Sequence, residues 1–134
     1  MKKTILAVAM MSILVTACGK DDGNNTTQDP IIGTWQLEQT FTSNVSDDIS
    51  DCEKQSIIEY HADGSYEATD KFDPEMGVEC VEDNYAGTWE NKGDNTYDIF
   101  TAGEEGAVAF TITFSGGKLI REIDSERYVY ISID

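Results

Sequence analysis

The sequence has few of the residues that many protein functions require. Of its 134 residues only 9 are Lys or Arg, against 26 Asp or Glu, and the formal net charge at pH 7 is −17. Binding to nucleic acid needs a basic face, so nucleic acid is excluded as a partner. There are only one His and three Cys. A Ser–His or Cys–His nucleophile therefore has little support, and we expect neither an enzyme nor a cofactor.

Proline and long apolar runs are also scarce. The 2 Pro and 11 Gly exclude fibrous and low-complexity classes. One apolar run covers residues 5–15, whereas a helix that spans a bilayer needs about 20 residues. Apolar residues still make up 40% of the chain and aromatic residues 10%, which excludes a wholly disordered acidic chain. The length fits one ordinary domain.

The first segment is predicted to be a secretory signal. Lys2 and Lys3 precede the apolar run, and basic residues followed by 7–15 apolar ones are typical of signal peptides. The run ends in Val15-Thr16-Ala17-Cys18, which resembles the bacterial lipobox that precedes a lipidated cysteine. We therefore predict a signal peptide over residues 1–17 and a lipid on Cys18. The alternative is an ordinary signal with an incidental cysteine.

Residues 18–30 contain no apolar residue after Cys18, and we expect a flexible tether there. Gly19 is not the Asp that retains lipoproteins in the inner membrane of enteric bacteria, which favours the outer membrane. Lys20-Asp21-Asp22 resembles the short signal that exports lipoproteins to the cell surface in Bacteroidetes. We expect an outer-membrane lipoprotein that faces either the periplasm or the outside.

From residue 31 onward the chain consists of short runs rich in β-branched and aromatic residues, separated by Gly, Asn and Asp turns. In the first run Trp35, Leu37 and Phe41 are expected on one face. Consecutive strands with short links predict an all-β fold, an eight-stranded antiparallel up-and-down β-barrel over residues 31–134. The expected strands are 33–42, 54–61, 65–71, 85–91, 95–101, 107–115, 118–123 and 127–133.

Several motifs carry a resemblance to a known family. Gly33-Thr34-Trp35 resembles the Gly-X-Trp motif of lipocalins, in which the Trp plugs the closed end of the barrel. A longer series resembles the small lipocalin-like domains of Bacteroidetes lipoproteins: Cys52, Ala62-Asp63-Gly64-Ser65-Tyr66, Cys80 and Gly87-Thr88-Trp89. The resemblance implies a calycin-like small barrel that binds a small hydrophobic ligand. It also implies a basic residue over Trp35, either Arg121 or Arg127.

In an up-and-down barrel the links alternate between the two ends. Counted along the chain, the second, fourth and sixth links (the even links) are short. The first strand begins at the end of the barrel where these even links lie, so the tether attaches there. Cys52 and Cys80 both fall in odd links, so we predict a disulfide between them; free thiols and a metal site are the alternatives. The odd links carry 13 acidic residues and no Lys or Arg: Asp47, Asp48, Asp51, Glu53, Asp73, Glu75, Glu79, Glu82, Asp83, Glu104, Glu105, Asp124 and Glu126.

The barrel interior is the candidate ligand site. A barrel of eight strands either holds one small ligand or is filled by its own side chains. If it is filled, the acidic loop end is expected to serve as a surface that binds a basic protein partner.

His61 is expected to be a turn residue, and no metal site is predicted because the sequence has no Asp-X-Asp-X-Asp-Gly calcium loop. The residues expected to point inward are Trp35, Tyr60, Tyr66, Trp89, Tyr97, Phe110 and Phe114.

Overall fold

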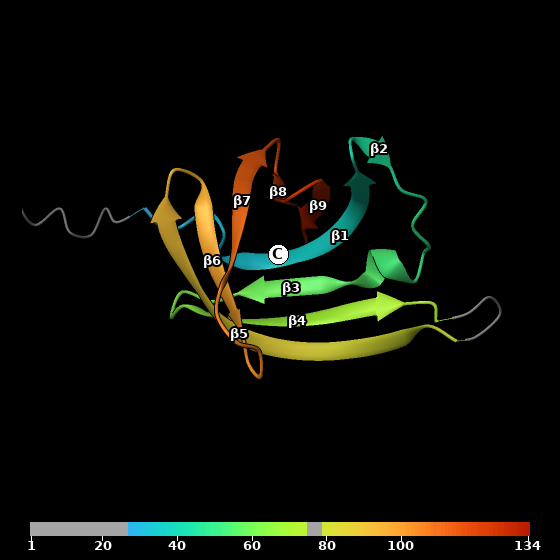
Figure 1. Ribbon diagram of the computed structural model, residues 1–134, viewed down its shortest axis with the longest axis horizontal. Coiled ribbons are helices and arrows are strands. Elements are labelled where there is room, and N and C mark those ends of the chain that lie inside the picture. The colour runs from blue at the N-terminus through green and yellow to red at the C-terminus, as the bar shows by residue number, and fades with distance from the viewer. Residues whose placement is uncertain (1–26, 75–78) are drawn as a thin grey trace, which may run out of the picture.

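A computed structural model describes residues 27–74 and 79–134 (Figure 1). The predicted signal peptide, Cys18 and the tether as far as residue 26 lie outside the described residues. Within the described ranges there is no helix that is long and apolar enough to cross a membrane.

The chain forms a closed antiparallel barrel, which confirms the predicted fold. Consecutive strands pair along the sheet, and β1 also pairs with β9, so that the sheet closes on itself. A two-residue strand, β2 (Val45–Ser46), folds back on the end of β1. The barrel strands are β1 (Gly33–Thr42), β3 (Ile57–Tyr60), β4 (Ser65–Phe72), β5 (Val81–Gly93), β6 (Thr96–Thr101), β7 (Val108–Ser115), β8 (Lys118–Ile123) and β9 (Glu126–Ser132).

Two strands begin three or more residues away from their expected starts, and the other boundaries agree within two residues. A 3-10 helix (Glu53–Gln55) occupies the expected start of the second strand, and β3 begins only at Ile57. β5 begins at Val81, well before the expected residue 85, because residues 81–86 continue to pair with β4. Glu82 and Asp83 therefore belong to a strand and not to a link.

A β-bulge in β1 changes which side chains face inward. The pairing of β1 with β9 shifts between Leu37 and Gln39, so the alternation of inward and outward residues reverses there. Phe41 consequently faces outward, where the Arg127 guanidinium lies 4.2 Å from the centre of its ring. The prediction that Phe41 shares a face with Trp35 and Leu37 is therefore wrong.

The end of the barrel with the short links is filled by side chains. Ile31 is fully buried there, and Trp35 is 7% exposed. The indole Nε1 of Trp35 donates a hydrogen bond to the Ile31 carbonyl oxygen at 2.8 Å, and its ring packs against Phe114. The indole of Trp89 donates to the His61 carbonyl oxygen at 3.0 Å. Both Gly-Thr-Trp triplets thus bring a tryptophan to this closed end.

Neither arginine covers Trp35, so that expectation is wrong. Arg121 stacks on Phe110 and on rings of β9, and Arg127 stacks on Phe41. The reason lies in the register: Trp35 pairs with Ser132, whereas Arg121 pairs with Ile112 on β7. Arg121 therefore lies farther along the barrel axis, toward the other end.

The last residues of the predicted tether are attached to the closed end of the barrel. The Asp29 carboxylate accepts hydrogen bonds from the Tyr97 hydroxyl at 2.8 Å and from the Asn91 side-chain amide at 2.7 Å. It also accepts one from the backbone N–H of Ile31 at 3.0 Å. Burial and this contact with Asp29 raise the pKa of Tyr97. Asp29, which the sequence assigned to the tether, is therefore part of the packing of the closed end.

Replacing Asp29 by Ala is expected to lower the free energy of unfolding by about 2 kcal/mol, because the Tyr97 hydroxyl loses its acceptor. Urea denaturation followed by circular dichroism measures this loss. The matched control is Asp48→Ala, which removes an exposed carboxylate of the opposite end. Equal effects of the two substitutions would contradict a specific role for Asp29.

Candidate functional site

The half of the barrel opposite the closed end contains two cavities, of about 440 Å³ and 380 Å³. These volumes fall in the range of small-molecule sites. Both cavities are lined by Arg121 and Asp70, and both reach the odd links, at Glu104 and Glu53 respectively. The first is also walled by Tyr66, Tyr85, Ile99 and Phe110, and the second by Leu37, Thr40, Tyr128 and Tyr130. We call this region the open half of the barrel.

Arg121 is the charged group at the centre of the open half. Its guanidinium lies 4.6 Å from the ring centre of Phe110, 5.1 Å from that of Tyr128 and 5.5 Å from that of Tyr130. Its Nε atom is buried and has no hydrogen-bond partner in the part of the chain that the structure describes. Burial acts to lower the pKa of Arg121, but the neighbouring tyrosine hydroxyls outweigh it and raise the pKa above its ordinary value. The side chain is therefore charged at every physiological pH.

Tyrosine hydroxyls are among the other polar groups in this half, beside the carboxylates of Asp70, Asp83, Glu104 and Glu53. Tyr85 donates a hydrogen bond to the Asp70 carboxylate at 2.9 Å, and the hydroxyls of Tyr66 and Thr101 lie 2.7 Å apart. Burial, together with the Asp70 charge, raises the pKa of Tyr85. The interior of the open half is therefore amphipathic, with aromatic walls that carry hydroxyl groups and with charged side chains of both signs.

Burial raises the pKa of Tyr130 to about 12, above the ordinary value of 10.0. Because the folded-state pKa lies above the unfolded one, the stabilisation is complete below pH 10 and is lost as the pH rises toward 12. We expect Tyr130 to account for about 2 kcal/mol of the fall in the free energy of unfolding over this interval, measured by urea denaturation, with further contributions from Tyr85 and Tyr97. Tyr130→Phe should reduce the fall. Tyrosinate absorbance that shows every tyrosine ionising near pH 10 in the folded protein would contradict this.

The aromatic residues expected to point inward lie mostly outside the cavities. Trp35, Tyr60, Tyr66 and Tyr97 are buried in the core. Trp89, Phe110 and Phe114 are partly buried and pack against it. Of these seven residues, Tyr66 and Phe110 line a cavity. Sequence reasoning missed Arg121, Asp70, Tyr85, Tyr128 and Tyr130, although strict alternation along 118–123 and 127–133 would have placed Arg121, Tyr128 and Tyr130 inside.

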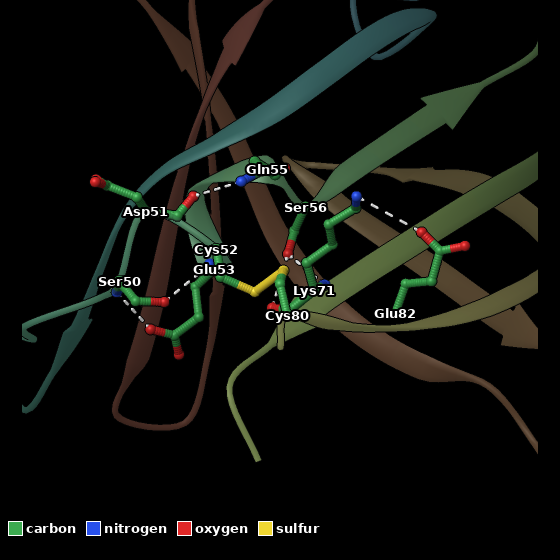
Figure 2. The surroundings of a disulfide bond; sticks show 9 residues. All are labelled: Ser50, Asp51, Cys52, Glu53, Gln55, Ser56, Lys71, Cys80 and Glu82. Carbon is green, nitrogen blue, oxygen red and sulfur yellow. Dashed lines mark hydrogen bonds and ion pairs between the residues drawn. A yellow bond between two sulfur atoms is a disulfide. The ribbon is translucent and has the colours of Figure 1, made fainter. Parts of the chain in front are cut away.

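The predicted disulfide is confirmed. Cys52 and Cys80 are bonded, with their Cα atoms 5.7 Å apart (Figure 2). The bond ties the 3-10 helix to the residue just before β5. The Glu53 carboxylate accepts a hydrogen bond from the Ser50 N–H at 2.6 Å, and the Glu53 N–H donates to the Ser50 hydroxyl at 3.1 Å. The disulfide and this reciprocal pair hold the link between β1 and β3 beside the second cavity, which Glu53 lines.

His61 belongs to the hairpin between β3 and β4, as expected. Its backbone N–H donates to the Ser65 carbonyl oxygen, and its carbonyl accepts from Gly64. The imidazole lies 3.7 Å from a Glu59 carboxylate oxygen and 3.6 Å from one of Glu67. These three side chains project from the outer surface of the barrel at its closed end, away from both cavities.

A closed antiparallel barrel that is filled at one end and hollow at the other is an architecture that holds small ligands. The chain matches the lipocalin-like domain family over residues 31–120. This protein therefore belongs to the lipocalin-like domain family.

Among solved structures, the chain is similar to an uncharacterized protein from Bacteroides eggerthii DSM 20697, known from a crystal structure at 2.60 Å resolution. The two share 13% sequence identity and superpose with a TM-score of 0.57, over 75% of this chain and 98% of the other. At this identity the likeness shows the fold alone. No curated protein matches the chain.

Proposed function

We propose that this protein is a membrane-anchored lipoprotein that binds a small hydrophobic ligand in the open half of its barrel and catalyses no reaction. The observation that carries the proposal is the pair of cavities at the end with the long links. The aromatic side chains of the opposite end fill the barrel, so the ligand would enter from the long-link end and stop above the closed half.

A fluorescent neutral probe, N-phenyl-1-naphthylamine, tests the binding role. We expect saturable binding to the wild-type protein, and binding about tenfold weaker in Val108→Trp, because the indole would occupy the first cavity. The matched control is Ala109→Trp, since Ala109 is exposed and follows Val108 on the same strand. No saturable binding to the wild type, or equal loss in both variants, would refute the proposal.

The membrane anchor is proposed from the sequence of residues 1–18. A single acyl chain binds membranes only marginally, whereas two or more hold a protein firmly. Mass spectrometry of the mature N-terminus should find an acylated Cys18, and Cys18→Ser should move the protein to the soluble fraction. An unmodified Cys18 would refute the anchor. Protease treatment of intact cells would then distinguish the outside from the periplasm.

A second candidate function rests on the charge around the open end. Glu53, Asp83 and Glu104 line the cavities and lie near the long links, where they form an acidic rim. Such a rim would attract a basic protein partner. Pull-down of a partner that fails only when the rim residues are neutralised, and that survives Val108→Trp, would favour this role over ligand carriage.

A further inference from the structure

Two carboxylates face each other on the outer surface of the barrel, beside the hairpin that joins β3 and β4. Glu59 is directly opposite Glu67 in the register of these strands. Both side chains point outward, because the residues on either side of each one are buried. Like charges in this position destabilise a sheet. The ion pairs formed within residues 27–74 and 79–134 bring no Lys or Arg to either carboxylate.

The imidazole of His61 completes this group on the outer surface. His61 follows Glu59 by two residues and therefore projects from the same face of the sheet. Its Nδ1 lies 3.7 Å from a Glu59 oxygen, and its Nε2 lies 3.6 Å from a Glu67 oxygen. One nitrogen of His61 and one oxygen of each carboxylate all lie within 4.8 Å of one another. The strand register and the hairpin thus bring three potential metal ligands together.

The spacing of these three atoms suits a small metal ion. In a tetrahedral zinc site the metal lies about 2.0–2.2 Å from nitrogen and oxygen ligands, so the ligands are roughly 3.3 Å apart. Starting from separations of at most 4.8 Å, the atoms need to approach by no more than about 1.5 Å. The side chains of Glu59 and Glu67 are 48% and 72% exposed, so rotation about their own torsions suffices and the backbone can stay in place.

We propose that Glu59, His61 and Glu67 form a zinc-binding site on the outside of the barrel. One imidazole nitrogen and one oxygen of each carboxylate serve as ligands, and water takes the fourth position. Imidazole suits zinc and other transition metals, whereas calcium and magnesium prefer oxygen ligands. The ion also removes the repulsion between the two carboxylates. This site is separate from both cavities of the open half and does not depend on the proposed ligand-binding function.

The surface beside the group leaves room for the remaining ligand of the ion. Glu59 and Glu67 line a hollow of about 480 Å³ that extends over β3, β4 and β5. Structural zinc sites are closed by four protein ligands, whereas a site with three keeps an open position. The closed end of the barrel is packed by Trp35 and Ile31 without help from a metal. We therefore expect a chelator to remove the zinc without unfolding the barrel.

Isothermal titration calorimetry with zinc chloride tests the site. The protein is the untagged chain with Cys18→Ser, so that no free thiol binds the metal, since Cys52 and Cys80 are bonded to each other. We expect one zinc ion per chain. The affinity should be at least about tenfold weaker in His61→Ala and in Glu67→Gln, because loss of even a residue behind a metal ligand typically costs about 10–100-fold.

Glu90→Gln is the matched control. Glu90 is directly opposite Asp98 on β5 and β6, as Glu59 is opposite Glu67, but His61 is the one histidine of the chain. We expect Glu90→Gln to bind zinc as tightly as its parent. A loss of affinity equal to that of Glu67→Gln would show that zinc is attracted only by the general negative charge of the surface, and the proposal would fail.

Nuclear magnetic resonance provides a second measurement, because a single histidine gives a single set of imidazole signals. These signals should change at one equivalent of zinc and remain unchanged in excess calcium. Absence of saturable zinc binding, or displacement of zinc by calcium, would overturn the proposal. Should His61→Ala fail to fold, as judged by circular dichroism, the affinity of Glu67→Gln and the imidazole signals of the parent protein decide the matter.

Discussion

Replacing Gly87 by Ala is expected to destabilise the barrel by about 3 kcal/mol, more than most single substitutions. A Cβ atom at residue 87 would overlap the backbone carbonyl oxygen of Phe100 on β6 and lie 2.9 Å from the Tyr66 ring. The obstacle is backbone on a paired strand, which cannot move aside as a flexible side chain would. Thermal unfolding followed by circular dichroism should show a midpoint lower by about 14 °C.

Gly93→Ala provides the matched control for this prediction, because Gly93 ends the same strand. Its φ is +86°, and no atom lies within 4 Å of a Cβ built there. Alanine at residue 93 therefore meets backbone strain without a clash, which costs about 1–2 kcal/mol. If Gly87→Ala proves no more destabilising than Gly93→Ala, the close approach of β5 to β6 does not require a glycine at residue 87.

Replacing both Cys52 and Cys80 by Ala is expected to lower the free energy of unfolding by about 3–4 kcal/mol. The cysteines are separated by 28 residues, and without the bond the unfolded chain gains the freedom of that loop. Urea denaturation of the double variant and of the wild type in reductant should give the same loss. A wild type whose unfolding does not change on reduction would contradict the prediction.

Loss of the disulfide should also affect the open half. The bond holds the link that contributes Ile49 and Glu53 to the second cavity. When this link is released, the ligand must order it again on binding, which weakens the affinity. Binding of N-phenyl-1-naphthylamine should therefore weaken on reduction in the wild type and remain unchanged by reductant in the Cys52→Ala, Cys80→Ala double variant.

Most of the fold could be predicted from local patterns. The alternation of Val108, Phe110, Ile112 and Phe114 matches β7, and the Asp63-Gly64 turn lies between β3 and β4. The bulge in β1 could not be predicted, because Glu38 gives no local signal. The bulge is fixed by the pairing of β1 with β9, which joins the two ends of the chain. The early start of β5 likewise depends on its partner strand and not on its own residues.

The candidate site was harder to predict than the fold. Aromatic content correctly indicated the core, but whether a ring fills the barrel or lines a cavity depends on side chains from strands far apart in sequence. Trp35 meets Phe114, for example, across the closed end. The family resemblance implied only that Arg121 or Arg127 covers Trp35, and charged residues are seldom buried, so residue type alone does not place Arg121 inside. Arg121 alternates with Leu119 and Ile123 along the strand, and this alternation was the signal that would have placed its side chain inside the barrel.

The bulge in β1 has a consequence for how the hollow of this barrel could evolve. Before the bulge β1 directs Leu37 inward, and after it Thr40 pairs with Tyr128 and lines the second cavity while Phe41 faces the solvent side. Regular alternation from Leu37 through Glu38, without the bulge, would exchange the two, so that a phenylalanine would occupy the space now bounded by a threonine. The bulge therefore sets the size of the second cavity, because it keeps a threonine and not a phenylalanine at the wall while the inward-facing residues of the other strands stay the same.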